Sequence, residues 1–162
     1  MTALGGKAGG PGVVVSNSIL SGNKMASQGK ESFGDVEFSD NNVLGDSSQD
    51  NLKSFYGEQP DQDTNIIATS NGNRPTDLDS ILAPLANNGG GTLTHALVEG
   101  SPAINAANNA ACPNIDQRGQ SREDRDCDIG AFEAFGLAGD PRTPEEAEVV
   151  VLPILDLILN GE

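Results

Sequence analysis

The triplets SIL (residues 18–20), NVL (42–44) and NII (65–67) recur along the chain, first after 24 residues and then after 23. Each triplet joins a small polar residue to two aliphatic residues. A period in the low twenties is typical of one coil of a solenoid, in which every coil adds short strands that pair with the coils on either side. The triplets therefore predict parallel strands, stacked in register about 4.8 Å apart.

Asparagines beside the triplets allow two interpretations. Asn17, Asn41 and Asn42 could stack, with side-chain amides bonded from coil to coil as in other cross-strand ladders. They could equally be separate turn residues in left-handed backbone. Around them, the β-branched run at 13–20 predicts a strand, and the polar run at 24–35 predicts a lateral loop.

Composition favours a stack over a conventional core. The 162 residues include 20 Gly, 5 Phe, 1 Tyr and no Trp, too few large side chains for an ordinary single core. Stacked coils need fewer, because each layer buries small aliphatic side chains against the next. The 24 acidic and 9 basic residues give a net charge of −15, which argues against nucleic acid as a partner and suits an extracellular protein.

Cysteine usage predicts an oxidising compartment. Cys112 and Cys127 lie 15 positions apart in a polar stretch, and we expect them to form a disulfide. A metal site would need further ligands, and the lone His95 is distant in sequence. The segment after Met1 lacks the basic and apolar parts of a signal peptide, so export would require a start further upstream. No run reaches the roughly 20 apolar residues of a membrane span.

Spaced motifs fill the region from residue 79 to residue 133. They resemble the choice-of-anchor Q domain, which is found at the C-terminal ends of bacterial surface and secreted β-helix proteins. The resemblance covers roughly a third of the chain. The motifs are LAPLANNGG (82–90), THAL (94–97), GSPAINA (100–106), DQRG (116–119) and CDIGAFE (127–133).

This resemblance implies a fold class and a division of the chain. The expected fold is all-β: the last coils of a right-handed parallel β-helix, similar to pectate-lyase-like repeats, with a C-terminal cap. We expect terminal coils with loop insertions over 1–78, a choice-of-anchor Q-like cap over 79–135, and a linker with an apolar tail over 136–162. In that family the cap precedes a variable surface-anchoring signal, and no catalytic activity is established for it.

The cap has an expected physical role. A β-helix that simply stopped would leave strand edges unpaired, and the cap is expected to turn the chain across that open end. His95 would satisfy nearby backbone groups, and Asp116 with Arg118 would form a local ion pair or hold the backbone. The residues expected to build the cap are Asn88, Gly89, Gly90, His95, Pro102, Asp116, Arg118, Gly119, Asp128 and Gly130.

Acidic residues around the second cysteine are calcium candidates. Asp124, Asp126 and Asp128 could offer oxygens to Ca²⁺, which takes six to eight such ligands. Arg122 and Arg125 lie among them and could neutralise the cluster, which leaves a solvated loop inside the disulfide as the alternative. No other metal or cofactor is expected.

The C-terminal run VVVLPILDLILN (149–160) is apolar and interrupted by Pro153. It is too short to span a bilayer, yet leaving its aliphatic side chains in water would be costly. We expect it to dock on the β-helix or on another protein, with residues 154–159 forming a short helix. An atypical anchor signal is the alternative.

Two functions are compatible with these features. The first is a non-catalytic structural and interaction module of a secreted or cell-surface β-helix protein, making adhesion or glycan contacts and stacking on upstream coils of its parent chain. The second is a fragment of a polysaccharide lyase or glycoside hydrolase of the β-helix type. No catalytic residue is expected, because carboxylate pairs such as Asp61 with Asp63 lie in turns and do not face each other across a sugar.

Overall fold

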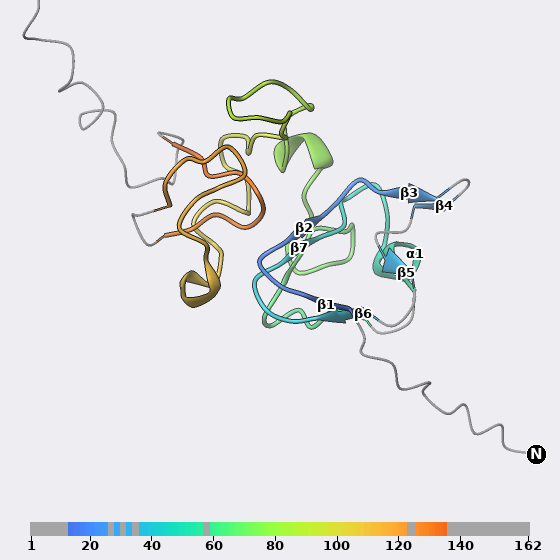
Figure 1. Ribbon diagram of the computed structural model, residues 1–162. Helices are drawn as coiled ribbons and strands as arrows, with labels where there is room; N and C mark the ends of the chain where they lie inside the picture. Colours follow the sequence, from blue (N-terminus) through green and yellow to red (C-terminus); the bar gives the residue numbers. More distant parts are fainter. Residues whose placement is uncertain are drawn as a thin grey trace, which may run out of the picture.

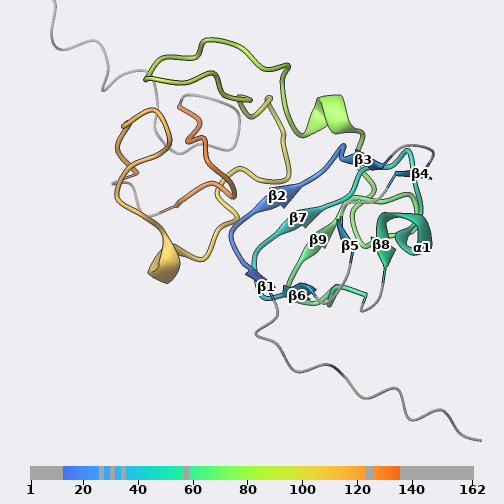
Figure 2. The ribbon, with the colours of Figure 1, turned by 45° about the vertical axis from the view of Figure 1, so that its right-hand side comes forward.

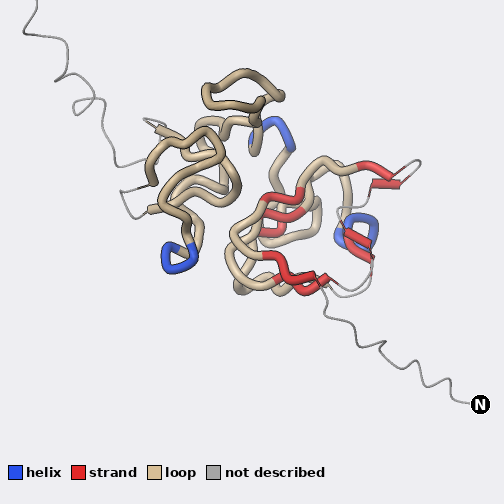
Figure 3. The backbone as a smooth tube through the Cα atoms, viewed as in Figure 1, coloured by secondary structure: helices blue, strands red, loops and turns tan. Residues whose placement is uncertain are grey.

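The computed structural model describes residues 13–25, 28–29, 32–33, 36–56, 59–122 and 126–135. Among the regular elements of these residues strands predominate over helices, but loops make up most of the described chain (Figure 3). The expected tail over 136–162, with its helix at 154–159, lies outside the described residues. In the described part, no helix is long and apolar enough to cross a bilayer.

The elements are short, and the described strands all lie within residues 13–67 (Figure 1). The strands are β1 (Val13–Val15), β2 (Ile19–Leu20), β3 (Lys24–Met25), β4 (Gln28–Gly29), β5 (Ser32–Phe33), β6 (Val36–Phe38), β7 (Val43–Leu44), β8 (Phe55–Tyr56) and β9 (Ile66–Ile67). The helical segments are α1 (Asn51–Ser54) and the 3-10 turns η1 (Leu78–Ser80) and η2 (Asn109–Ala111).

Strands β2, β7 and β9 lie side by side in that order and run parallel (Figure 2). Their register aligns Ile19 with Val43 and Ile66, and Leu20 with Leu44 and Ile67. The predicted in-register parallel pairing of the three triplets is confirmed. Strand β1 pairs with β6, and β5 with β8, again in parallel and at an offset of 23 residues. The regular structure of the described residues is therefore mostly strand, arranged largely in small parallel sheets.

Side chains cover both faces of the β2–β7–β9 sheet. Neighbouring residues of a strand point to opposite faces, so the middle and third residues of each triplet lie on different faces. The third residue of each triplet packs with Phe38 and Phe55, whose rings meet edge to face with centroids 5.7 Å apart. The middle residue of each triplet joins a second cluster with Ile81, Leu97 and Ile129. The first face is thus buried by β6 and β8, and the second by the cap.

The structure corrects two expectations about residues 13–35. Asn17 divides the expected 13–20 strand into β1 and β2, because its φ of 46° is left-handed and cannot continue an extended strand. The 24–35 segment, expected to be a loop, contains the antiparallel hairpin of β3 and β4 and also the strand β5. A polar composition suggested a loop, but it does not prevent backbone pairing.

The two interpretations of the asparagines hold at different residues. The backbone N–H of Ser18 donates to Asn42 Oδ1 (3.0 Å), and Asn42 Nδ2 donates to Asn65 Oδ1 (2.8 Å), so these side-chain amides link residues 24 and 23 positions apart. Asn42 and Asn65 are buried, which makes such bonds obligatory. Asn17 and Asn41 are the left-handed turn residues, with φ of 46° and 59°.

The segment that follows β9 covers the outer edge of this strand, the last strand of the β2–β7–β9 sheet. Ile67 donates its N–H to Asn73 Oδ1 (2.8 Å) and accepts from the N–H of Arg74 (3.1 Å). Thr76 donates its N–H to the carbonyl of Ala68 (2.9 Å). The expectation that the cap crosses this open end is therefore wrong: the cap lies beside the stack and covers a sheet face, and residues 73–76 occupy the end (Figures 1 and 2).

Candidate functional site

The cap begins with an antiparallel excursion of the chain over residues 82–97. Leu82 bridges Leu97, and Ala86 bridges Thr94, whose backbone groups exchange two hydrogen bonds of 3.0 Å. Asn88 holds the turn by donating its side-chain amide to the Thr94 carbonyl (2.8 Å). We call residues 82–97 the hairpin.

Gly90 places the hairpin turn against the second half of the cap. Its φ is 75°, and a Cβ there would lie 2.7 Å from the Cα of Arg118. A side chain at this position would force the two segments apart. The neighbouring Gly89 also has positive φ (93°), so the glycines expected in the cap do serve a left-handed turn.

Asp116 is the centre of the DQRG turn. It is 5% exposed, and its Oδ1 accepts the backbone N–H of Arg118 (2.7 Å) and of Gln120 (3.0 Å). Its Oδ2 accepts the N–H of Glu133 (3.0 Å), which joins this turn to the CDIGAFE motif. Gly119, with φ of 83°, completes the turn.

Arg118 binds the same carboxylate and reaches across to the CDIGAFE segment. Its guanidinium lies 2.6 Å from Asp116 Oδ2 and donates to the Glu133 carbonyl (2.6 Å). It also stacks over the ring of Phe132, 3.6 Å from the centroid, an arrangement that favours a cation. Asp116 and Arg118 therefore form a local ion pair and also hold backbone groups.

The electrostatics of Asp116 follow from these contacts. Burial acts to raise the pKa of its carboxyl, but the Arg118 side chain and the backbone N–H groups of Glu133, Gln120 and Arg118 outweigh burial and lower the pKa below its ordinary 3.8. The carboxylate is therefore charged at neutral pH, and its contribution to stability depends on staying so.

A second ion pair lies deeper in the cap. Arg122 Nη1 lies 2.9 Å from Glu133 Oε2, with side chains 3% and 0% exposed. Arg122 also donates to the carbonyls of Asp128 (2.9 Å) and Gly130 (2.7 Å). Neither residue was among those predicted to build the cap. The signal in the sequence was the place of Glu133 at the end of the CDIGAFE motif.

Asp128 uses both carboxylate oxygens inside the cap. Oδ1 accepts the N–H of Asn105 (2.8 Å), and Oδ2 accepts the N–H of Ala134 (2.6 Å). This buried carboxylate is therefore committed to the backbone, while Asp126 is exposed and Asp124 lies outside the described residues. Among the described residues, no group of three His, Cys, Asp or Glu side chains is placed to hold a metal ion.

The left-handed asparagines fasten the cap to the stack. Asn17 exchanges hydrogen bonds with the backbone of Asn108 (2.7 and 3.1 Å), and its carbonyl accepts the N–H of Gly130 (3.0 Å). Asn41 donates its amide to the Ala106 carbonyl (2.9 Å). Gly130 itself has φ of 101°, and a Cβ there would lie 3.0 Å from the Ile19 Cδ1 atom.

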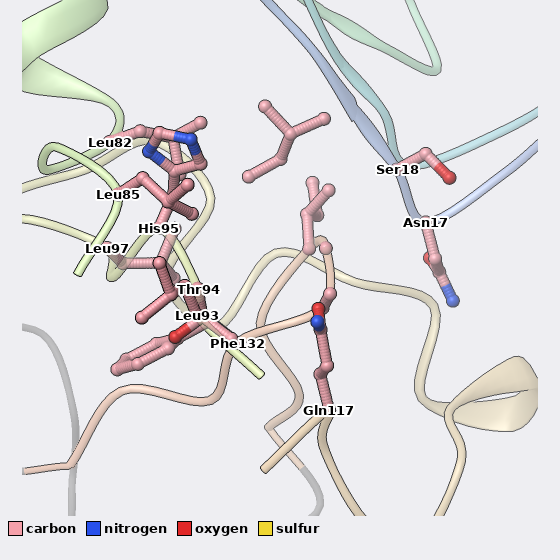
Figure 4. A pocket seen from close by; sticks show the side chains of 14 residues that line it. Asn17, Ser18, Leu82, Leu85, Leu93, Thr94, His95, Leu97, Gln117 and Phe132 are labelled. Carbon is pink, nitrogen blue, oxygen red and sulfur yellow. The ribbon is translucent and has the colours of Figure 1, made fainter. Parts of the chain in front are cut away.

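A cleft of about 510 Å³ lies between residues 17–19 and the cap (Figure 4). Asn17 and Ser18 stand on one wall, and hairpin side chains with Phe132 form the other. His95 lies in the hairpin wall with Nδ1 2.7 Å from the Ala83 carbonyl oxygen, where a protonated Nδ1 would donate. The lining residues are Asn17, Ser18, Ile19, Leu82, Leu85, Leu93, Thr94, His95, Leu97, Gln117, Ile129, Gly130, Ala131 and Phe132.

The structure brings most of the expected cap residues into one body. Pro102 is fully buried in it, whereas Gly89 is exposed at the hairpin tip and His95 is exposed beside the cleft.

Comparison with known proteins adds nothing to this picture. No family model, no curated protein and no solved structure matches the chain.

The predicted disulfide is confirmed. Cys112 and Cys127 are bonded, with Cα atoms 6.5 Å apart. The bond closes the loop that carries Asp116, Arg118 and Arg122. We expect the double variant Cys112→Ser/Cys127→Ser to lose about 3 kcal/mol of unfolding free energy, since the open loop gains entropy when unfolded.

Urea unfolding without reductant measures this loss. Reductant should weaken the wild-type protein by a similar amount and leave the double variant unchanged. Equal stability of the wild type and the double variant would show that the disulfide does not support the cap.

The lowered pKa of Asp116 predicts a pH dependence of stability. The pKa of the Asp116 carboxyl is lower in the folded protein than in the unfolded chain. The carboxylate therefore stabilises the fold fully at pH values above the pKa of the unfolded chain, and this stabilisation is lost as the pH falls through the pKa of the folded protein. Asp116→Asn should cost about 1.5–3 kcal/mol near pH 7, and the cost should shrink as pH falls below 4. Urea titrations from pH 7 to pH 2.5 measure it, with exposed Asp63→Asn as control. A cost independent of pH would contradict the assignment.

Proposed function

We propose that this chain forms the last coils and cap of a right-handed parallel β-helix of the choice-of-anchor Q type. Its role is that of a non-catalytic structural and interaction module. Support comes from the parallel strand pairs, which share an offset of 23 or 24 residues across separate sheets. A chain that winds with a constant coil length produces such a pattern.

The functional proposal rests on one observation: the charged side chains of the cap motifs bind groups within the cap. Asp116, Arg118, Arg122, Asp128 and Glu133 bind one another or backbone groups within the cap. Carboxylates that act on a sugar must instead face a substrate across an open site. These charges therefore support a role in fastening the cap.

The disulfide and the acidic composition support a secreted or cell-surface location. Disulfides persist in oxidising compartments, and a net charge of −15 keeps an exported protein solvated. The partners that fit such a location are cell-surface components or glycans, contacted by the exposed loops. A bacterial surface protein with an adhesive role is the biological setting that we propose.

Incubation with pectin, alginate and neutral glycans, with and without calcium, tests the proposal. We expect no cleavage, and we expect retention of at least one surface glycan on immobilised protein. Calcium-dependent cleavage that Asp126→Ala abolishes would overturn the proposal in favour of the polysaccharide lyase alternative.

A further inference from the structure

The two cysteines of the disulfide differ in their access to solvent. Cys127 is 2% exposed, whereas Cys112 is half-buried. Disulfide exchange begins when a thiolate attacks one of the two sulfur atoms, and its rate depends on access to that sulfur. An external thiol therefore reaches the Cys112 side of the bond more readily than the Cys127 side.

A second cleft opens beside the disulfide. Its volume of about 540 Å³ falls within the roughly 300–1,000 Å³ of small-molecule sites, so a small thiol has room there. None of the described residues that line it is acidic, so no carboxylate among them repels an incoming thiolate. These residues are Asn109, Ala110, Cys112, Pro113, Asn114, Arg122 and Cys127.

Cys127 is held by contacts that do not depend on the disulfide. Its backbone N–H donates to Asn109 Oδ1 (3.0 Å), and its carbonyl accepts the N–H of Ala107 (3.0 Å). Asp128, the next residue, is bonded to the backbone through both carboxylate oxygens. The N–H of Cys112 makes a longer bond, 3.4 Å to the Asn109 carbonyl oxygen. Cleavage of the disulfide therefore leaves Cys127 in place and gives Cys112 more freedom to move.

We propose that Cys112 is the site at which a small thiol opens this disulfide, and that the fixed Cys127 closes it again. The incoming thiolate bonds to Cys112 Sγ, the bond between the two Sγ atoms breaks, and Cys127 Sγ leaves with the electron pair as a thiolate. When that thiolate attacks Cys112 Sγ in turn, the small thiolate leaves and the disulfide is restored.

Exchange at Cys112 acts on the cap. The loop between the two cysteines carries Asp116, Arg118 and Arg122, whose side chains fasten the cap. Opening the disulfide removes the covalent closure of this loop, so a thiol in the surroundings loosens the cap reversibly. This inference does not depend on the proposed surface function.

Peptide mapping of the wild-type protein tests the site of attack. The folded protein is treated with 2-mercaptoethanol, quenched in acid and digested with pepsin, and mass spectrometry locates the mixed disulfide. We expect about tenfold more adduct on Cys112 than on Cys127, because a buried sulfur reacts only after local opening. The same reaction in urea should erase this preference. Equal labelling of the folded protein, an adduct mainly on Cys127, or a disulfide that resists the thiol until the protein unfolds overturns the proposal.

Two single-cysteine variants form a matched pair that isolates each thiol. Cys127→Ser leaves the Cys112 thiol, and Cys112→Ser leaves the Cys127 thiol. The Cys112 thiol should react about tenfold faster with dithiodipyridine, a neutral aromatic disulfide, and urea should make the two rates equal. Equal rates in the two variants, once urea unfolding curves have shown both to be folded, contradict the assignment.

Removal of the thiol tests the closing role of Cys127. After the small thiol is diluted, the wild-type protein should lose its adduct and recover the disulfide. Cys127→Ser, loaded with the same adduct through the oxidised form of 2-mercaptoethanol, should keep it on Cys112. An adduct that persists equally in the two proteins would show that Cys127 does not close the bond.

Discussion

Arg122→Met should lower the free energy of unfolding by about 3–5 kcal/mol, the loss expected when one partner of a buried ion pair is removed. The Glu133 carboxylate, at 0% exposure, would lose the Arg122 guanidinium, and the carbonyls of Asp128 and Gly130 would lose a donor. Urea unfolding at pH 7 measures this loss.

Two further variants make the experiment specific. Arg74→Met changes an exposed arginine and should stay within about 0.5 kcal/mol of the wild type. Adding Glu133→Leu to Arg122→Met removes the carboxylate that Arg122 had neutralised and should recover part of the stability. A loss below about 1 kcal/mol for Arg122→Met would show that the buried pair does not hold the cap.

Leu44→Ala should cost about 2–5 kcal/mol, because it opens a cavity in the layer shared by all three triplets. Leu44 is 0% exposed and lies between Leu20 and Ile67 in the stack. Thermal and urea unfolding both report the change.

Leu52→Ala is the matched control for Leu44→Ala. Leu52 is 78% exposed in α1 and should be nearly neutral. Equal effects at the two positions would mean that the face of the sheet that carries Leu44 is not a packed core.

The sequence predicted the features that depend on local repetition. The spacing of SIL, NVL and NII predicted the parallel pairing and its register, because aliphatic residues at the same position in each repeat bury one another. The Cys112–Cys127 bond followed from composition and spacing in the same way. Both are patterns that a single chain displays along its length.

The position of the cap could not be predicted from such patterns. The sequence of a parallel strand that is buried on both faces does not indicate which segment covers its second face. Here that face is covered by Ile81, Leu97 and Ile129, which lie in loops. The Arg122–Glu133 pair was missed because residues 11 apart in irregular chain show no periodicity. The end closure by Asn73 was missed because an asparagine in a turn is usually a local feature.

Hydrogen-bond scalar couplings measured by NMR on uniformly labelled protein test the central claim, the parallel stacking of the triplets, most directly. We expect couplings from the Val43 nitrogen to the Ser18 carbonyl carbon, and from the Ile66 nitrogen to the Asn42 carbonyl carbon, since these groups are bonded at 3.0 and 2.9 Å. Parallel strands at an offset of 24 and 23 residues give these pairs. Couplings that instead pair the triplets in antiparallel order, or slow-exchanging amides in all three triplets with no coupling between them, would contradict the stack.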